Sequence, residues 1–282
     1  MRATSSGTAF VFAGGGVRGA VHVGQLRALF ERGITPDLVV GTSVGAINGA
    51  VVARDPHPDV AHEMLQMWQT DEARAVFGQA WTRQAGRVIR GRTYTLSARP
   101  LVDLISMHFP PRTQIEDLDL PFVTVATSIE RAAERSFDTG PLVPAVVASA
   151  TVPGLLPPAV IDHEHYFDGG LVASVPLGQA VRRGATTIYV LQAGQLDHQM
   201  TVPTSMVETL NVYVDITRRH SFTHALEHVP EGVTVYVLPT GGKPKVRGLK
   251  ALMSLEHTAE RAELAYQATS VELDRIAGMH PA

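Results

Sequence analysis

Short apolar runs alternate with helical and glycine-rich segments along the first fifty residues of the chain. Residues 9–13 form an apolar run of the kind that is buried in a parallel sheet, and this run stops at a glycine cluster. Residues 38–40 form a second such run, which ends at Gly41. Between the two runs, apolar side chains recur at helical spacing at Val23, Leu26 and Phe30. The pattern predicts the order strand, loop, helix, strand, turn and helix.

Strand-like runs return later in the chain, at residues 122–126, 166–167, 187–191 and 233–237. Helical runs separate several of them, which favours an α/β layer architecture over a β-sandwich. Residues 55–120 carry scattered charges and few strand-like runs. We therefore expect that segment to form a mainly helical cover or lid outside the sheet.

The 282 residues and their 45% hydrophobic content can build a sizeable core, and we expect a single domain over residues 1–282. Residues 241–282 are expected to add a C-terminal helical extension. Within it, residues 249–276 have the pattern of a long closing helix or a helix pair.

Composition and charge exclude several classes of function. The formal net charge of -3 argues against nucleic acid as a partner, because domains that bind it are usually strongly basic. The chain has no cysteine, so disulfides, thiolate zinc sites and cysteine nucleophiles are excluded. Residues 1–8 are polar and the next apolar run is broken by glycines, so we expect neither a signal peptide nor a spanning segment, and a cytoplasmic location.

A glycine-rich loop follows the first predicted strand. It consists of Gly14, Gly15, Gly16, Val17, Arg18 and Gly19. The spacing satisfies the dinucleotide-binding pattern, but that function also needs an acidic residue at the end of the second strand, where this chain has Thr42 and Ser43. Successive glycine N–H groups beside a helix end can bind an oxyanion instead. A glycine turn that only packs helix against strand is the structural alternative.

A second motif follows the second predicted strand. Its residues are Gly41, Thr42, Ser43, Val44 and Gly45, and they precede a helical run over 46–53. A G-x-S-x-G sequence between a strand and a helix is typical of a sharp turn that exposes a nucleophilic serine. Ser43 comes after only two strands, whereas the α/β-hydrolase fold places its nucleophile after several. The motif therefore predicts a serine nucleophile on a different fold.

The base that would activate Ser43 has two kinds of candidate. His163 and His165 lie in a polar stretch before the strand at 166–167, where a hairpin turn is a simpler interpretation than a catalytic or metal site. Asp168 follows that strand and precedes Gly169 and Gly170, which allow close backbone approach. A carboxylate can serve as the base if burial raises its pKa toward neutral pH.

Together these residues resemble the patatin-like phospholipase family. The resemblance covers four segments in family order, residues 14–19, 41–45, 148–154 and 168–170. It implies a three-layer α/β fold with a mostly parallel sheet between helices. It also implies hydrolysis of acyl chains from phospholipids, lysophospholipids or neutral esters, without a metal or other cofactor.

The resemblance also implies individual roles. Ser43 would attack the ester carbonyl, and Asp168 would take its proton as the second member of a dyad. Backbone N–H groups of Gly15 and Gly16 would stabilise the oxyanion, with Arg18 nearby to support the loop or an anionic substrate group. The chain departs from the family after Gly170, where many relatives carry asparagines and residues 173–176 read Ala-Ser-Val-Pro.

Three functions fit these residues. The first is a lipid acyl hydrolase, and the second is an acyltransferase or thioesterase that forms the same acyl-enzyme. The third is a non-catalytic lipid-binding module, which the intact serine, carboxylate and glycine loop disfavour. In each case the expected partner is a lipid or acyl ester.

Residues 73–102 contain six arginines and no acidic residue. The arginines are Arg74, Arg83, Arg87, Arg90, Arg92 and Arg99. Trp81 and an apolar pair lie among them, so the segment could contact a lipid surface peripherally. A solvated helical face with buried aromatic anchors is the structural alternative.

Overall fold

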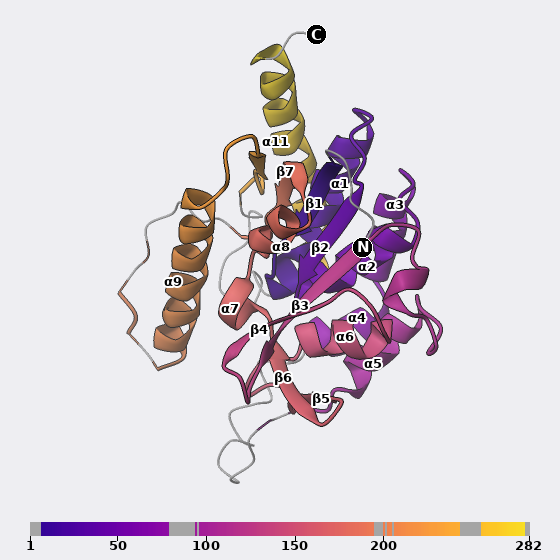
Figure 1. Ribbon diagram of the computed structural model, residues 1–282, viewed down its shortest axis with the longest axis vertical. Helices are drawn as coiled ribbons and strands as arrows, with labels where there is room; N and C mark the ends of the chain where they lie inside the picture. The colour runs from indigo at the N-terminus through magenta and orange to yellow at the C-terminus, as the bar shows by residue number, and fades with distance from the viewer. Residues whose placement is uncertain are drawn as a thin grey trace.

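The computed structural model describes residues 7–78, 94, 96–194, 200, 202–204, 206–242 and 255–279, and between 206 and 214 it describes the side chains of 209 and 212 only. Its centre is an eight-stranded sheet with the order β5-β6-β3-β2-β1-β7-β8, in which β4 also pairs with β3 (Figure 1). The strands are β1 (Gly7–Phe12), β2 (Leu38–Thr42), β3 (Phe122–Ser128), β4 (Ala133–Phe137), β5 (Ala159–Ile161), β6 (Glu164–Asp168), β7 (Ala185–Leu191) and β8 (Thr234–Leu238).

The sheet has a parallel part and an antiparallel part. Strands β3, β2, β1, β7 and β8 are parallel to their neighbours along that order. Strands β4, β5 and β6 extend the sheet beyond β3 through antiparallel pairs. The fold is therefore the expected α/β type with a mostly parallel central sheet.

Helices cover both faces of the sheet. They are α1 (Val21–Phe30), α2 (Val44–Arg54), α3 (Val60–Met67), α4 (Asp71–Ala73), α5 (Arg99–Ser106), α6 (Leu142–Ser149), α7 (Gly170–Ala173), α8 (Leu177–Arg182), α9 (Met206–Glu227) and α11 (Thr258–Met279). Shorter turns are η1 (Gly16–Ala20), η2 (Arg74–Gly78), η4 (Ile115–Asp117) and η5 (Leu255–His257). No helix in the described ranges is long and apolar enough to cross a membrane.

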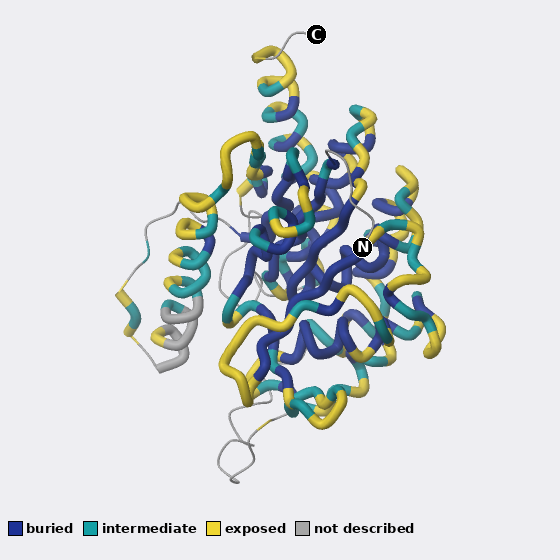
Figure 2. Tube along the Cα trace, in the orientation of Figure 1, coloured by how far each residue is buried: buried dark blue, intermediate teal, exposed yellow. Residues whose placement is uncertain are grey.

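Each face of the sheet packs against its own hydrophobic cluster. Side chains of successive strand residues point to opposite faces, so Phe10 and Phe12 of β1 enter one cluster while Val11 enters the other. The first cluster includes side chains of α1, α2, α3, α5 and α6, and the second includes those of α8 and α9. The central strands are mostly buried, and the exposed positions lie mainly on outer helices, on loops and on β4 (Figure 2). This double burial explains why β1 and β2 are continuous apolar runs in the sequence.

The strand-like runs of the sequence all form strands, with small shifts at their ends. Two further strands have no such run. Strand β4 has the sequence AERSF and only its last residue, Phe137, is buried, while β5 has three residues. The described residues of the segment 55–120 contain α3, α4, η2, α5 and η4 and no strand.

Helices α1 and α11 approach each other closely at Gly24. A Cβ atom at this position would lie 1.9 Å from the backbone oxygen of Ala262. We expect Gly24→Ala to lower the free energy of unfolding by about 1–3 kcal/mol or more, because the two backbones must separate to admit a methyl group. Urea denaturation followed by circular dichroism measures this change.

Gly278→Ala is the matched control for this prediction. Gly278 lies in α11 and a Cβ atom there would meet no other atom within 4 Å. Alanine favours helix more than glycine does, so this variant should be as stable as the unaltered protein or slightly more stable. Equal stability of the Gly24→Ala variant would show that α11 does not pack on α1 in this way.

Candidate active site

The segments that carry the predicted site residues meet at one end of the parallel strands. The glycine loop follows β1 and Ser43 follows β2, and these two strands are parallel neighbours. Asp168 ends β6 and pairs with Ala126 of β3, while β3 is the other neighbour of β2. Segments that are far apart in the sequence therefore meet at the carboxyl end of β2, where open α/β sheets commonly bind ligands.

Ser43 lies on the sharp turn between β2 and α2. Its backbone has φ 58° and ψ -128°, a conformation that is strained for a residue with a side chain. The turn is held in place by Ser149, whose hydroxyl accepts a hydrogen bond from the Ser43 N–H at 2.9 Å and donates one to the Val125 carbonyl at 2.6 Å. The strain at Ser43 is thus supported by β3 and α6.

The two glycines of the G-x-S-x-G motif are required for steric reasons. A Cβ atom at Gly41 would lie 2.3 Å from the backbone oxygen of Gly45, and one at Gly45 would lie 2.2 Å from the backbone oxygen of Phe12. Both contacts are with backbone, which cannot move aside as a flexible side chain can. The motif therefore lets β1, β2 and α2 meet at one point.

Asp168 is hydrogen-bonded to Ser43 within the protein interior. Its Oδ2 accepts a hydrogen bond from the Ser43 Oγ at 2.6 Å, and its Oδ1 accepts one from the Gly170 N–H at 2.7 Å. Asp168 is 7% exposed and Ser43 is 9% exposed. Gly169 allows this approach, because a Cβ atom there would lie 2.1 Å from the backbone oxygen of Val125. The carboxylate is oriented by its neighbours before any substrate binds.

Burial raises the pKa of Asp168 from 3.8 to about 6, because the ionised carboxylate has lost its hydration. The hydrogen bonds from Ser43 and Gly170 and the positive charge of Arg218 oppose this rise. Near neutral pH the carboxylate is ionised, yet it is a much stronger base than an exposed aspartate. A group in this state can accept a proton from the serine hydroxyl.

The glycine loop lies directly beside Ser43. A Cβ atom at Gly14 would lie 3.3 Å from the Cβ of Ser43, and the Gly14 N–H donates to the Ser174 carbonyl at 2.8 Å. The backbone N–H groups of Gly15 and Gly16 donate no hydrogen bond to any residue that the structure describes. Within that part of the chain, the loop therefore presents unpaired donors close to the serine.

Arg18 and Gly19 belong to the turn η1 that follows the loop. The Arg18 Nε donates to the Gly15 carbonyl at 3.3 Å, and burial lowers the pKa of Arg18. The Gly19 carbonyl accepts a hydrogen bond from the Asn48 Nδ2 at 3.0 Å, and the same nitrogen lies 3.0 Å from Nδ1 of His22. Burial lowers the pKa of His22 to about 3, so this histidine is neutral at physiological pH.

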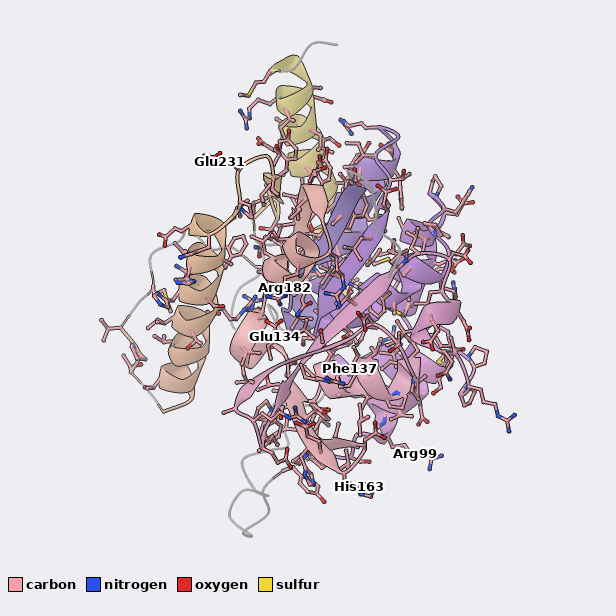
Figure 3. All side chains as sticks on the ribbon, viewed as in Figure 1. Arg99, Glu134, Phe137, His163, Arg182 and Glu231 are labelled. Carbon is pink, nitrogen blue, oxygen red and sulfur yellow. The ribbon has the colours of Figure 1, made fainter. Side chains whose placement is uncertain are left out.

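The two histidines that the sequence singled out lie at the other end of β6. Strands β5 and β6 form an antiparallel hairpin whose turn contains Asp162 and His163, both with positive φ. Figure 3 places His163 at the tip of this hairpin. His165 pairs with Glu130 at 2.6 Å. Glu164 and Asp168 begin and end β6, which separates the turn from the carboxylate by about 13 Å.

Two side chains of the site have no motif in the sequence that marks them. Arg218 of α9 donates from Nη2 to the Gly14 carbonyl at 2.7 Å and from Nε to the Ser174 hydroxyl at 2.7 Å. Ser174 lies within residues 173–176, where the sequence departs from the family pattern. No local pattern distinguishes Ser174 from the other serines of the chain, and Arg218 is one of several polar residues on a long helix.

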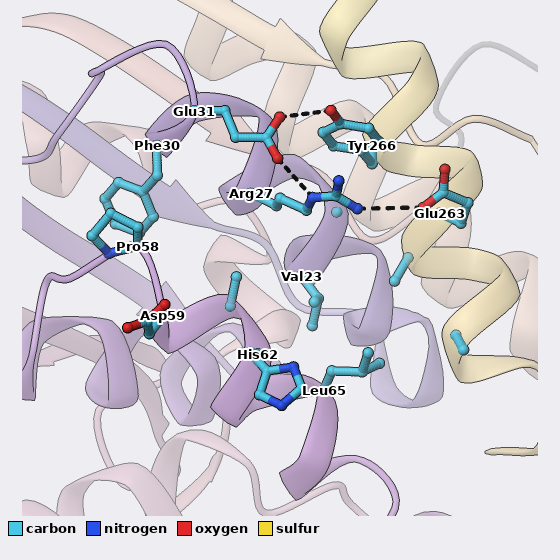
Figure 4. A pocket seen from close by; sticks show the side chains of 14 residues that line it. Val23, Arg27, Phe30, Glu31, Pro58, Asp59, His62, Leu65, Glu263 and Tyr266 are labelled. Carbon is cyan, nitrogen blue, oxygen red and sulfur yellow. Dashed lines mark hydrogen bonds and ion pairs between the residues drawn. The ribbon is translucent and has the colours of Figure 1, made fainter.

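A separate cavity of about 770 Å³ lies between α1, α3 and α11 (Figure 4). Arg27 contacts Glu31 at 2.8 Å and Glu263 at 3.5 Å beside it, and the Tyr266 hydroxyl donates to Glu31 at 2.6 Å. None of the predicted site residues lines this cavity. Over the described ranges, no three His, Asp or Glu side chains are grouped to hold a metal ion.

The α/β fold, the serine on a strand-to-helix turn and the buried carboxylate that accepts its hydrogen bond together define a class of proteins. The comparison with protein families identifies the class more closely. The family model described as patatin-like phospholipase matches residues 10–181, and the chain belongs to this family.

Individual relatives agree with this assignment. The patatin-like phospholipase domain-containing protein 7 of Rattus norvegicus is 32% identical over 200 residues, which are 69% of this chain and 14% of that protein. The lysophospholipase NTE1 of Mycosarcoma maydis is 32% identical over 210 residues, which are 71% of this chain and 10% of that protein. The chain thus spans a small part of the length of these relatives.

Among solved structures, VipD from Legionella pneumophila is similar over 97% of this chain and 68% of that chain, with a TM-score of 0.47 and 14% sequence identity. The type III effector protein ExoU is similar over 96% of this chain and 53% of that chain, with a TM-score of 0.45 and 15% identity.

The buried charge of Asp168 leads to a prediction about stability. The pKa of Asp168 is higher in the folded protein than its ordinary value, so its contribution to stability is fully present below pH 3.8 and is lost as the pH rises through about 6. The amide that replaces the carboxyl in Asp168→Asn cannot ionise. We expect this variant to be more stable than the unaltered protein at pH 8, by up to about 3 kcal/mol, and the gain to shrink toward pH 4.

Thermal and urea unfolding at pH 8, 6 and 4.5 test this expectation. Asp103→Asn is the control, because Asp103 lies near the surface and pairs with Arg99 at 3.7 Å. It should leave the pH dependence of stability as it is in the unaltered protein. An Asp168→Asn variant that is less stable at pH 8 would contradict the electrostatic account of this site.

Proposed function

We propose that the protein hydrolyses acyl esters of lipids, with Ser43 as the nucleophile and Asp168 as its base. The observation that carries this proposal is the 2.6 Å contact between the Ser43 Oγ and the Asp168 Oδ2 in a buried site where the pKa of Asp168 is about 6. Membership of the patatin-like phospholipase family supports a phospholipid, lysophospholipid or neutral ester as the substrate. The name of the relative NTE1 supports a lysophospholipid in particular.

In the first half of the reaction, the Ser43 Oγ attacks the carbonyl carbon of the ester while its proton passes to Asp168. The carbonyl oxygen becomes an oxyanion, which the N–H groups of Gly15 and Gly16 stabilise, because the Gly14 N–H is already bonded to the Ser174 carbonyl. When the tetrahedral intermediate collapses, the alcohol leaves with the proton from Asp168. The acyl group is then esterified to Ser43.

In the second half, Asp168 removes a proton from a water molecule that attacks the acyl-enzyme. The same loop stabilises the second oxyanion, and the collapse returns the proton to Ser43 and releases the fatty acid. An alcohol in place of water would give acyl transfer, and a thioester substrate would give thioesterase activity through the same intermediate. Product analysis with radiolabelled acyl chains separates hydrolysis from transfer.

Arg18 and Gly19 support the loop in this proposal. Arg18 contacts the Gly15 carbonyl, and Gly19 leaves no room for a side chain because its Cβ atom would lie 2.5 Å from a methyl carbon of Val44. Gly41, Gly45 and Gly169 have a related role, since each allows a backbone approach that brings the serine and the carboxylate together. Gly170 supplies the N–H that orients Asp168.

A peripheral membrane contact through residues 73–102 remains a prediction from the sequence. Residues 79–93 and 95, which include four of the six arginines, lie outside the described residues. The two flanking arginines form ion pairs, Arg74 with Asp71 at 2.7 Å and Arg99 with Asp103 at 3.7 Å.

We likewise propose a single domain in which residues 55–120 cover the sheet.

Substitution of either member of the dyad tests the proposal. We expect Ser43→Ala and Asp168→Asn each to lower kcat for a soluble short-chain ester by about a thousandfold or more, because the two groups act as one unit. Ser43→Ala should also abolish labelling by a fluorophosphonate probe. Circular dichroism verifies that both variants are folded.

The histidine variants are the controls. His163→Ala, His165→Ala and the double variant should keep most activity, and chelation should not reduce it. Full activity in a folded Ser43→Ala or Asp168→Asn variant would reject the dyad. A loss of about a hundredfold in a histidine variant would favour a Ser–His mechanism.

The pKa of Asp168 also predicts the pH dependence of the reaction. Only the ionised carboxylate can accept the serine proton, so kcat/KM should rise with pH through a midpoint near 6. The profile is measured with a soluble ester over a range in which the protein stays folded. A midpoint near 6 that disappears in the double histidine variant would assign the titration to a histidine instead.

A further inference from the structure

Helix α9 lies against α7, the helix that follows Asp168. Helix α9 itself lies beyond residue 181, where the match to the family model ends. Figure 1 shows α9 beside α7. Phe222 of α9 is buried in the hydrophobic cluster on that face of the sheet, and the Ser221 hydroxyl donates to the Val172 carbonyl at 3.2 Å. Helix α9 is thus packed on the site from a part of the chain beyond the family motifs.

Arg218 extends from α9 into the site. Its side chain is 11% exposed and makes the two 2.7 Å hydrogen bonds described above, one to the Gly14 carbonyl and one to the Ser174 hydroxyl. Asp215, one turn earlier on the same helix, lies 3.7 Å from its Nη1. The planar guanidinium therefore joins the glycine loop to the segment after Asp168. Its hydrogen bonds are charge-assisted, which makes them stronger than hydrogen bonds between neutral groups.

The bond to Gly14 has a consequence for the oxyanion site. The carbonyl of Gly14 and the N–H of Gly15 belong to one planar trans peptide unit, so they point in opposite directions. Rotation of that unit is inexpensive between two glycines, because neither residue has a side chain that restricts it. When Arg218 holds the carbonyl, it also sets the direction of the Gly15 N–H. The Gly14 N–H, bonded to the Ser174 carbonyl, fixes the preceding peptide unit.

We propose that Arg218 is a positioning residue that holds the Gly14–Gly15 peptide unit with the Gly15 N–H directed toward the oxyanion. This inference rests on the proposed hydrolase function and adds a residue to it. Ser174 is the second anchor of Arg218. Arg218 of α9 and Ser174 of the segment after Asp168 therefore support the loop together.

Arg218 also affects the base through its charge. Burial, together with the nearby positive charge of Arg18, lowers the pKa of Arg218 to about 10, and Asp215 and Asp168 oppose this shift. Arg218 therefore stays protonated near neutral pH, and its charge lowers the pKa of Asp168. The other groups that lower the pKa of Asp168 are the Ser43 hydroxyl and the Gly170 N–H. Loss of the Arg218 charge should thus move the Asp168 titration to higher pH.

Three variants separate the geometric effect from the charge effect. Arg218→Met removes the hydrogen bonds and the charge at similar length. Arg218→Lys keeps the charge but cannot reproduce the planar fork that reaches both acceptors. Ser174→Ala removes one of the two anchors. Arg275→Met is the control, because Arg275 is 58% exposed and pairs with Glu272 on α11.

With a soluble short-chain ester, Arg218→Met should lower kcat about tenfold to a hundredfold with KM changed less than about threefold, as expected when a catalytic donor is misplaced. In this variant, the midpoint near pH 6 of the kcat/KM profile should move to higher pH. Arg218→Lys should lower kcat but keep the pH midpoint of the unaltered protein. Ser174→Ala should lower kcat by a smaller factor than Arg218→Met does. Arg275→Met should behave as the unaltered protein.

Hydrogen exchange followed by mass spectrometry supplies a readout that does not depend on turnover. Peptides that cover residues 13–20 should exchange faster in Arg218→Met than in the unaltered protein and in Arg275→Met. Folded Arg218 variants with unaltered kcat, or with unaltered exchange in this loop, would overturn the positioning role. A wild-type protein that is inactive and unlabelled by the fluorophosphonate would instead reject the hydrolase function, and faster loop exchange in Arg218→Met would still support the contact of Arg218 with the loop.

Discussion

The site depends on the close approach of the backbones of β1, β2 and α2 around Ser43. At Gly41 and Gly45 a side chain would collide with backbone oxygen atoms at 2.3 and 2.2 Å. Only glycine permits the turn, and the turn forces Ser43 into a conformation that costs of order 1–3 kcal/mol. The surrounding structure holds this conformation because the Ser43 N–H is bonded to Ser149, which is itself bonded to β3. The serine is thus oriented by the sheet rather than by a flexible loop.

The same arrangement makes the site energetically unfavourable in isolation. Ser43 is strained, and Asp168 is ionised near neutral pH although burial has raised its pKa to about 6. These costs are offset by apolar burial on both faces of the sheet, where β1 contributes Phe10 and Phe12 to one cluster and Val11 to the other. A site that is built at one end of a doubly covered sheet can therefore keep a strained serine and a buried charge without unfolding.

The sequence predicted the parts of the structure that local chemistry determines. Strands buried on both faces leave continuous apolar runs, and tight turns require small residues at fixed spacing, so β1, β2 and the region of Ser43 and Asp168 could be identified. Strand β4 could not, because four of its five residues are at least partly exposed and carry no apolar pattern. Arg218 could not either, since its contact with Gly14 spans 204 positions along the chain. No local pattern marks which arginine of a long helix will be buried against a distant loop.

A carboxylate can replace histidine as the base only if opposing effects on its pKa are balanced. Burial alone would raise the pKa of Asp168 further, and a carboxyl that is protonated at neutral pH cannot accept a proton. The Ser43 hydroxyl, the Gly170 N–H and the charge of Arg218 all favour the ionised form and limit the rise to a value of about 6. That value is close to the ordinary pKa of histidine, so the Asp168 carboxylate has a basicity similar to that of an imidazole. Because Arg218 also bonds to the Gly14 carbonyl, one side chain of α9 affects both the pKa of Asp168 and the glycine loop.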